Sequence, residues 1–268
     1  MFVYDRYNRH IHYLRISVTD RCNLRCRYCM PEEGVHLMNH CDILSFEEIT
    51  EVVRIAVNLG VDKFRITGGE PLVRKNIVKL ISMIASVDGV KDLSMTTNGI
   101  LLEELALPLK EAGLRRVNIS LDTLNPEKFK EITRGGDINR VLRGIEAAKE
   151  AGLEPIKINC VVYKSSKEDD AQKVKEFCSI NKLQVRFIHQ MNLETGEFSV
   201  VEGGEGGNCH LCNRLRLTAN GMVKPCLFDE DEFSVRELGA EKALLAALNI
   251  KPLNGCLNTK GSFYNIGG

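Results

Sequence analysis

The sequence lacks an excess of charge of either sign, a long apolar run and an internal repeat. Its 268 residues carry 36 Lys and Arg against 36 Asp and Glu, so neither a basic nucleic-acid-binding surface nor an acidic tail is indicated. No apolar stretch is long enough to span a bilayer, and the first ten residues, MFVYDRYNRH, lack the apolar core of a signal peptide. We therefore expect a soluble, globular, cytoplasmic protein that binds neither nucleic acid nor a membrane.

Cysteine, in contrast, is abundant: the chain has ten, although cytoplasmic proteins rarely use them as disulfides. Six of them form two tight groups. The first group has the spacing C-x3-C-x2-C and comprises Cys22, Cys26 and Cys29. The second is a C-x2-C pair followed by a third cysteine, and comprises Cys209, Cys212 and Cys226. The remaining four are scattered, and we expect small buried hydrophobic residues at Cys41, Cys160, Cys178 and Cys256.

Short apolar runs alternate with helical patterns, which predicts parallel strands joined by right-handed helical crossovers. Strands are predicted at 13–18, 63–67, 92–97, 116–121, 155–162 and 184–188. Helices are predicted at 45–59, 76–86, 101–112, 137–151 and 168–180, with a further one near 241–248. Six such units are too few for a full eight-stranded barrel. The run Gly203-Gly204-Glu205-Gly206-Gly207 is interpreted as a flexible linker.

The predicted strands alternate polar and apolar residues, although parallel strands buried on both faces are almost continuously apolar. Period two places the apolar set under the helices and the polar set on the opposite face, where it lines an interior cavity. That face carries four cations: Arg15, Arg65, Lys157 and Arg186. Cations at a cavity are costly without a partner, so an anionic ligand such as a phosphate is indicated. An open or antiparallel sheet with a solvated face is the alternative.

The first cysteine group lies in one loop directly after the first predicted strand. Three thiolates in such a loop can hold three irons of a 4Fe–4S cube and leave the fourth iron open to an exogenous ligand. A zinc ion would normally take a fourth protein ligand. Since a fourth ligand could come from His10, His12, His36 or Cys41, zinc stays open on spacing alone.

This loop, with Tyr28 before its last cysteine, resembles the signature of the radical S-adenosylmethionine (SAM) enzymes. Three further segments recur in that family's order: Gly68-Gly69-Glu70-Pro71, Thr96-Thr97-Asn98-Gly99 and Ser120-Leu121-Asp122. The resemblance implies an α/β fold, a partial (βα)6 TIM-like barrel. In it the open iron chelates SAM, and an electron cleaves SAM to a 5′-deoxyadenosyl radical. It also implies SAM contacts for Tyr28, Gly69, Ser120 and Met191.

The second cysteine group is followed by two cations, Arg214 and Arg216, which alternate in a predicted strand. Asn220-Gly221 is a hairpin-turn signal that can fold Cys226 back toward Cys212. A second iron–sulfur cluster next to an anionic substrate fits these residues. A structural zinc knuckle with His210 as the fourth ligand is the alternative.

Residues 212–221 (CNRLRLTANG), residues 14–22 (LRISVTDRC) and the closing Ile266-Gly267-Gly268 closely resemble the GTP 3′,8-cyclases of molybdenum-cofactor biosynthesis. That resemblance implies a radical SAM lyase with a partial barrel over 1–191 and a small C-terminal iron–sulfur cluster domain over 192–268. It implies two 4Fe–4S clusters, and a catalytic role for the tail residues Gly267 and Gly268. The GTP contacts that it implies are Arg15, Arg65, Thr96, Lys157, Arg186, Arg214, Leu215 and Arg216.

The segment between Met191 and Cys209 is much shorter here than is usual in that family, which leaves room for a divergent homologue with another substrate. Two other hypotheses therefore stay open. One is a radical SAM enzyme with an auxiliary cluster that acts on a peptide or another metabolite. The other is a non-enzymatic iron–sulfur or zinc sensor. For the cyclase we expect GTP and a flavodoxin- or ferredoxin-like electron donor as partners, and leave a homodimer open.

Overall fold

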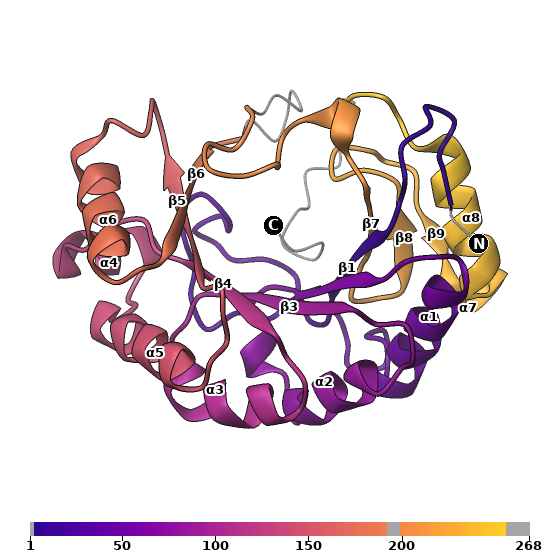
Figure 1. Ribbon diagram of the computed structural model, residues 1–268, viewed down its shortest axis with the longest axis horizontal. Helices are drawn as coiled ribbons and strands as arrows, with labels where there is room; N and C mark the ends of the chain where they lie inside the picture. The colour runs from indigo at the N-terminus through magenta and orange to yellow at the C-terminus, as the bar shows by residue number, and fades with distance from the viewer. Residues whose placement is uncertain (1–2, 192–198, 256–268) are drawn as a thin grey trace.

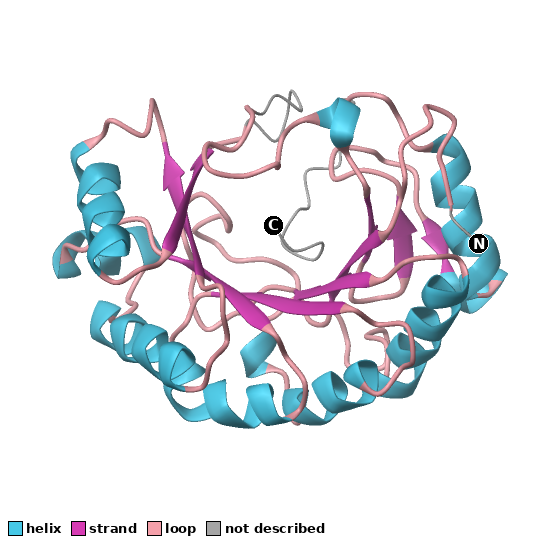
Figure 2. Cartoon of the chain, in the orientation of Figure 1, coloured by secondary structure: helices cyan, strands magenta, loops and turns pink. Residues whose placement is uncertain are grey.

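One curved sheet of nine strands dominates the part of the chain that the computed structural model describes, residues 3–191 and 199–255. Its order is β6-β5-β4-β3-β2-β1-β7-β8-β9. Figure 1 shows the strands curling around a central space, and Figure 2 shows the helices as a layer on the outer side. The fold is thus a partial TIM-like barrel, as predicted.

The first six strands are parallel, and each pairs with the next along the chain. They agree within two residues with the predicted ranges: β1 (Tyr13–Ser17), β2 (Lys63–Thr67), β3 (Asp92–Thr97), β4 (Arg116–Ser120), β5 (Lys157–Val162) and β6 (Gln184–His189). The predicted helices are confirmed as α1 (Phe46–Asn58), α2 (Ile77–Ala85), α3 (Leu102–Glu111), α5 (Ile138–Glu150), α6 (Asp169–Ile180) and α8 (Ala240–Ile250). Among the described residues, no helix has the length and apolar character that crossing a membrane requires.

Several short elements escaped the sequence analysis. The longest is α4 (Pro126–Thr133), although Asn125 caps it by accepting a hydrogen bond from the Lys128 amide and Pro126 occupies its first turn. The others are the single turns η1 (Pro71–Val73) and η2 (Cys209–Leu211), the strands β8 (Met222–Lys224) and β9 (Phe233–Ser234), and the helix α7 (Val235–Leu238).

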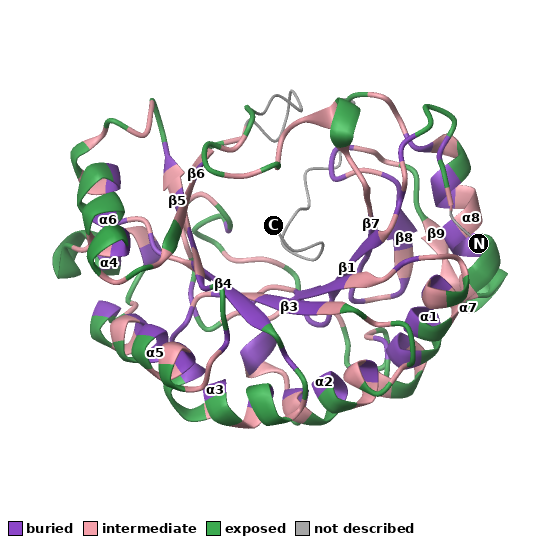
Figure 3. Cartoon of the chain, viewed as in Figure 1, coloured by how far each residue is buried: buried purple, intermediate pink, exposed green. Residues whose placement is uncertain are grey.

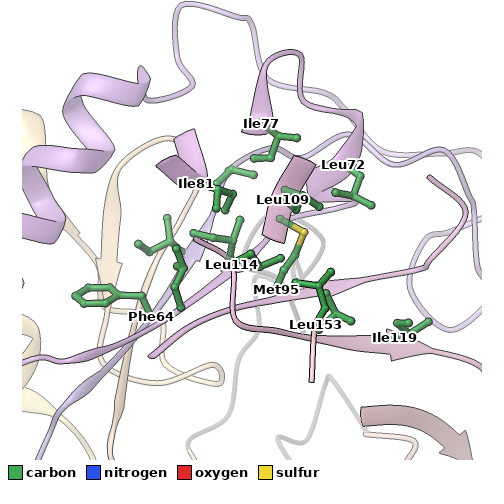
Figure 4. Packing of buried hydrophobic residues seen from close by; sticks show 14 of the residues in the cluster. Phe64, Leu72, Ile77, Ile81, Met95, Leu109, Leu114, Ile119 and Leu153 are labelled. Carbon is green, nitrogen blue, oxygen red and sulfur yellow. The ribbon is translucent and has the colours of Figure 1, made fainter. Parts of the chain in front are cut away.

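The sheet has one apolar and one polar face, as the period-two pattern predicts. Apolar strand residues pack under the helices, and Figure 4 shows Phe64, Met95 and Ile119 within this core. All three are completely buried. Figure 3 shows the helices buried on the side that faces the sheet and exposed on the other. The polar strand residues are thereby left to face the central space.

The C-terminal residues extend this sheet. β7 (Arg214–Leu217) pairs in parallel with β1, and β8 returns antiparallel to β7 through a turn that ends at Gly221. Gly221 has a φ of +88°, so the Asn-Gly hairpin signal is confirmed. Because the sheet runs unbroken from β1 into β7, the predicted division at residues 191 and 192 stays a prediction.

The glycine-rich segment 203–207 is not a free linker, so that interpretation is wrong. Glu202 forms an antiparallel bridge with Phe187 of β6, through hydrogen bonds of 3.0 and 3.1 Å. At Gly203, with a φ of +78°, an added Cβ would lie 2.6 Å from the Val185 carbonyl oxygen. Glycine is therefore needed here because the backbone is in close contact with the edge strand, not because the segment must bend freely.

Candidate active site

A cavity occupies the polar face of the sheet and contains most of the predicted cations. Its lining comes from β1, β2, β4, β5, β6 and β7, from residues 199–209 and from the segment around Cys226. Its lining cations are Arg15, Lys63, Arg65, Arg186, Arg214, Arg216 and Lys251. Glu205 is the single carboxylate among the described lining residues. The alternative of an ordinary solvated face is therefore wrong, and the cavity suits a polyanion.

The strand register places these cations in rows. Arg65, Arg15 and Arg216 lie side by side across β2, β1 and β7. Each of the three is at most 8% exposed. Burial and then the neighbouring Arg216 hold the pKa of Arg15 well below its usual value. Burial and then Arg214 lower the pKa of Arg216 to about 10. The positive charges of the row thus repel one another, and an anion in the cavity would relieve that repulsion.

Several buried polar atoms on this face have no hydrogen-bond partner within the described residues. They are the Tyr13 hydroxyl, the Nε atoms of Arg15, Arg186 and Arg214, both amide atoms of Asn118, and the Thr96 hydroxyl. Buried polar groups in folded proteins are nearly always paired, so a cluster of unpaired ones points to a ligand that satisfies them. Both donors and acceptors are present, which fits a ligand with phosphate oxygens and polar ring atoms.

Three predicted substrate residues lie outside the lining, namely Thr96, Lys157 and Leu215. Lys157 begins β5 beside the cavity, and burial, followed by Arg186 and Arg116, lowers its pKa to about 8. Leu215 belongs to the apolar core at 4% exposure, so its side chain faces away from Arg214 and Arg216. Only the backbone of Leu215 can reach a ligand in the cavity.

The loop of the first cysteine group is clamped by the end of α4. The Arg25 and Arg27 amides donate to the carbonyls of Thr133 and Ile132. The Arg134 guanidinium donates to the carbonyls of Arg25 (3.0 Å) and Met30 (2.9 Å). Sequence reasoning missed this clamp together with α4.

The thiols of this loop lie near one another: besides burial, a negative charge on Cys29 would raise the pKa of both Cys22 and Cys26. Burial raises the pKa of Cys22 to about 11 and that of Cys26 to about 12. Thiolates are the metal ligands, so loading this loop releases protons.

Neither thiol group is preformed for a single metal ion. The residues that the structure describes include no set of three His, Cys, Asp or Glu side chains placed to hold one. Of the residues offered as a fourth zinc ligand, His36, Cys41 and His210 are exposed, His10 and His12 are partly buried, and His12 is hydrogen-bonded to Asp62 at 3.1 Å. A 4Fe–4S cube binds each thiolate to a different iron, so it needs three thiols around a volume rather than around a point. Both cysteine groups fit the cube better than they fit zinc.

The motifs after β2, β3 and β4 gather against the first cysteine loop. At Gly69 an added Cβ would lie 2.4 Å from the Arg21 carbonyl oxygen, next to Cys22. The buried Glu70 carboxylate accepts hydrogen bonds from the Thr97 hydroxyl (2.8 Å) and the Asn98 amide (2.6 Å). Burial raises the pKa of Glu70 to about 7. Glu70 therefore ties the second and third motifs together.

Tyr28 and the fourth motif are also linked. The Tyr28 hydroxyl donates to Asp122 at 2.9 Å, and Asp122 accepts a second hydrogen bond from the Val161 amide at 2.8 Å. Ser120 ends β4 on the polar face. Met191, the last predicted SAM residue, lines the cavity and packs against Leu227 and Phe228, as Cys226 does.

The three cysteines of the second group line the cavity together with Arg214 and Arg216. Arg216 pairs with Lys224, which brings Cys226 level with Arg214, two residues from Cys212. Burial opposes ionisation of Cys212, but Lys251 and Arg214 outweigh it and lower the pKa of that thiol. The shortened segment 192–208 therefore leaves this group at the cavity.

Two distant cations hold the second group in place, and no local sequence pattern identifies either. Arg9 donates to the carbonyls of Cys209 (2.7 Å) and Pro252 (2.8 Å), and the buried Asp5 carboxylate orients it at 2.6 Å. Lys251 donates to the carbonyls of Arg214 (2.8 Å) and Pro225 (2.6 Å).

The remaining cysteines are divided. Cys160 and Cys178 are buried as expected, whereas Cys41 is exposed on a loop, so that expectation is wrong for Cys41. Cys256 and the tail residues Gly267 and Gly268 lie outside the described residues.

The two cysteine groups lie at opposite ends of β1. Cys22 follows the carboxyl end of this strand, whereas Cys212 precedes Arg214, which pairs with Tyr13 at the amino end. The strand rises about 3.3 Å per residue, so its five residues separate the two levels by about 13 Å. The row of Arg65, Arg15 and Arg216 lies between these two levels.

Comparison with known proteins shows similarity along nearly the whole chain. The family model for the radical SAM superfamily matches residues 16–178. A GTP 3′,8-cyclase of Alkaliphilus oremlandii is 43% identical, with 86% of this chain and 85% of the relative covered. A GTP 3′,8-cyclase of Thermodesulfovibrio yellowstonii is 40% identical over 310 positions, with 96% of each chain covered. Since 96% of 268 residues is only about 257, that relative has about 50 positions that this chain lacks.

Solved structures show the same fold at lower identity. SuiB of Streptococcus suis bound to its precursor peptide SuiA has a TM-score of 0.67 at 18% identity, covering 92% of this chain and 67% of SuiB. The protein anSMEcpe with bound AdoMet has a TM-score of 0.54 at 23% identity, covering 69% of this chain and 51% of anSMEcpe. At such identities the likeness concerns the fold alone.

Proposed function

Because this chain belongs to the radical SAM superfamily and, within it, to the GTP 3′,8-cyclase family, we propose that it converts GTP to 3′,8-cyclo-7,8-dihydro-GTP in molybdenum-cofactor biosynthesis. It is a radical SAM lyase that uses SAM and two 4Fe–4S clusters. The observation that carries the substrate is the row of buried arginines between the two cysteine groups, since their mutual repulsion favours the binding of a polyanion.

The cysteine groups would hold the two clusters, the first at Cys22, Cys26 and Cys29 and the second at Cys209, Cys212 and Cys226. When bound, the first cluster and SAM supply the 5′-deoxyadenosyl radical that takes a hydrogen atom from the ribose of GTP. The protein's own contribution is binding, orientation and exclusion of water. Arg134 fixes the first loop, and Arg9 and Lys251 fix the second.

The SAM contacts that we propose are Tyr28, Gly69, Ser120 and Met191. The close contact between Gly69 and the backbone of Arg21 supports the assignment of Gly69, because it holds the motif after β2 beside the cysteine loop. The hydrogen bond from Tyr28 to Asp122 fixes the tyrosine beside β4. Met191 lines the cavity and packs against Leu227 and Phe228.

The GTP contacts that we propose are Arg15, Arg65, Thr96, Lys157, Arg186, Arg214, Leu215 and Arg216, with Leu215 acting through its backbone. Arginine suits the triphosphate because its guanidinium can donate two parallel hydrogen bonds to phosphate oxygens. The unpaired Nε atoms of Arg15, Arg186 and Arg214 support this assignment. Bringing the triphosphate into the row relieves the repulsion between the arginines.

We propose catalytic roles for Gly267 and Gly268. A two-residue deletion tests them, and it should leave SAM cleavage but nearly eliminate the cyclised product. A flavodoxin- or ferredoxin-like protein would supply electrons, and the chain would act in the cytoplasm, as its nine described free thiols favour. A homodimer is the assembly that we propose to test by sedimentation.

The test is anaerobic reconstitution of the full chain with iron and sulfide, followed by SAM, GTP and a reductant, with mass spectrometry of the products. We expect 5′-deoxyadenosine and the cyclised nucleotide together. Cys26→Ala should abolish both, whereas Cys212→Ala should keep 5′-deoxyadenosine and lose the cyclised product. Cys41→Ala, which removes an exposed cysteine outside both groups, is the matched control. SAM cleavage without any cyclised product in the wild type would refute the proposal.

A further inference from the structure

Tyr13 lies among the cations of the cavity, next to the row of Arg65, Arg15 and Arg216. Neither its position nor its residue type indicated a functional residue in the sequence. It begins β1 on the polar face, with Lys63 beside it on β2 and Arg214 beside it on β7. Its ring centroid is 5.2 Å from Lys63 Nζ, 5.6 Å from Arg65 Cζ and 5.7 Å from Arg214 Cζ. Three cations therefore surround one aromatic ring in the wall of the cavity.

The ring lowers the cost of holding these cations together. An aromatic face attracts a cation within about 6 Å of its centroid, and the attraction strengthens when water is excluded. Tyr13 is only 5% exposed, so the contacts are largely desolvated. The ring thus partly offsets the mutual repulsion of Lys63, Arg65 and Arg214.

The hydroxyl of Tyr13 is buried and has no hydrogen-bond partner among the described residues. Asp92, a carboxylate near these cations, is already paired with Arg116 (2.6 Å) and Lys63 (3.7 Å). Burial opposes ionisation of the phenol, but Arg65, Arg15 and Arg214 together lower its pKa. A phenol in such surroundings is a stronger hydrogen-bond donor, and what it lacks is an acceptor.

We propose that Tyr13 is a polyphosphate-binding residue whose hydroxyl donates a hydrogen bond to a phosphate oxygen of the nucleotide, while its ring keeps three cations in position around the same group. The inference rests on the proposed function, because GTP supplies the phosphate. It adds a neutral phenol donor to the guanidinium and ammonium groups of the site.

Tyr13→Phe separates the two contributions of the side chain, since it removes the hydroxyl and keeps the ring. A buried hydroxyl without a partner destabilises the nucleotide-free protein, so the melting temperature without nucleotide should stay the same or rise. The affinity for GTP should fall about 10- to 100-fold, the range for a hydrogen bond to a charged group. The affinity for inorganic triphosphate should fall by the same factor. Tyr163→Phe, at a tyrosine 60% exposed outside the cavity, should change none of these values.

Binding is measured by anaerobic calorimetry on the reconstituted full chain, and melting by circular dichroism on the same samples. Three outcomes would overturn the inference: unchanged affinity for both ligands, a loss for GTP without a loss for triphosphate, or a melting temperature that falls together with the affinity. The first outcome would show that Tyr13 does not contact the ligand, and the second that it contacts the nucleoside rather than the phosphates. The third would show that Tyr13 only stabilises the fold. Tyr13→Leu, which removes the ring as well, should weaken both ligands more than Tyr13→Phe does. If the wild type binds GTP but forms no cyclised product, the proposed function fails while the Tyr13 test stands.

Discussion

Lys157 allows the electrostatic reasoning about the cavity to be tested without any cofactor. Burial and the neighbouring Arg186, Arg116 and Arg65 lower its pKa from 10.5 to about 8. One pKa unit is worth 1.36 kcal/mol, so this difference corresponds to about 3 kcal/mol of unfavourable interaction. Lys157 is only partly buried, and solvent screening reduces that figure to about 1 kcal/mol. Lys157→Met removes the charge and keeps the length of the side chain.

The sign of the pH dependence follows from the lowered pKa. Between about pH 8 and 10.5 the unfolded chain holds a proton on Lys157 that the folded chain has released, so this group makes stability rise with pH. Below pH 8 both states are charged, and the full penalty applies. Lys157→Met should therefore increase the free energy of unfolding by about 1 kcal/mol at pH 7, and the gain should shrink toward zero near pH 10.5.

The assay is urea unfolding of the nucleotide-free protein at pH 7 and pH 9.5, followed by GTP binding at pH 7. Lys157→Met should weaken GTP binding about 10-fold or more, because it removes the charged group that we propose as a donor to the triphosphate. Lys164→Met, at an exposed lysine two residues beyond β5, is the control for loss of a positive charge. A variant that is less stable than the wild type at pH 7, or equally changed at both pH values, would refute the reasoning.

Three further outcomes are expected. Arg214→Ala should weaken GTP binding by about 1.5–3 kcal/mol, measured by calorimetry, and leave SAM binding nearly unchanged; equal GTP affinity would contradict the assignment. Gly69→Ala should lower SAM affinity in equilibrium dialysis, since its Cβ would meet the Arg21 carbonyl oxygen at 2.4 Å; unaltered affinity would show that the loop can shift. Arg9→Ala should reduce the iron content from about eight toward about four per chain, because it frees the Cys209 carbonyl, and iron analysis showing a full complement would count against that anchor.

The polar face of the barrel could be predicted from the sequence because its signal is local. Alternation in β1 places Arg15 between Leu14 and Ile16, and the same period in β2 places Arg65 between Phe64 and Ile66. Since side chains alternate strictly along a strand, the inward-facing residues of each strand can be predicted from its own sequence, whichever strands pair with it. Tyr13 obeys the same alternation, and was missed because an aromatic residue at a strand start is more often part of the core.

The remaining features depend on contacts between distant parts of the chain. No local pattern states that β7 pairs with β1, and without that pairing the row of Arg65, Arg15 and Arg216 cannot be seen. Arg9 donates a hydrogen bond to the carbonyl of Cys209, 200 residues away, and the residues next to Arg9 in the sequence give no indication of that contact. Cys41 is exposed although cysteine is usually buried, because the average burial of a residue type does not determine the burial of one particular loop position.

The short connection between β6 and the second cysteine group is compatible with an intact site because the connection does not place that group. β7 is held by its pairing with β1, and the flanking loops are held by Arg9 and Lys251. β6 and β7 face each other across the central space (Figure 1), so the chain has only to cross from one to the other. The described residues of this connection run beside β6, where Glu202 bridges Phe187. Gly204, Gly206 and Gly207 of the same connection line the cavity. The positions missing relative to longer family members are therefore not what brings Cys209, Cys212 and Cys226 to the cavity.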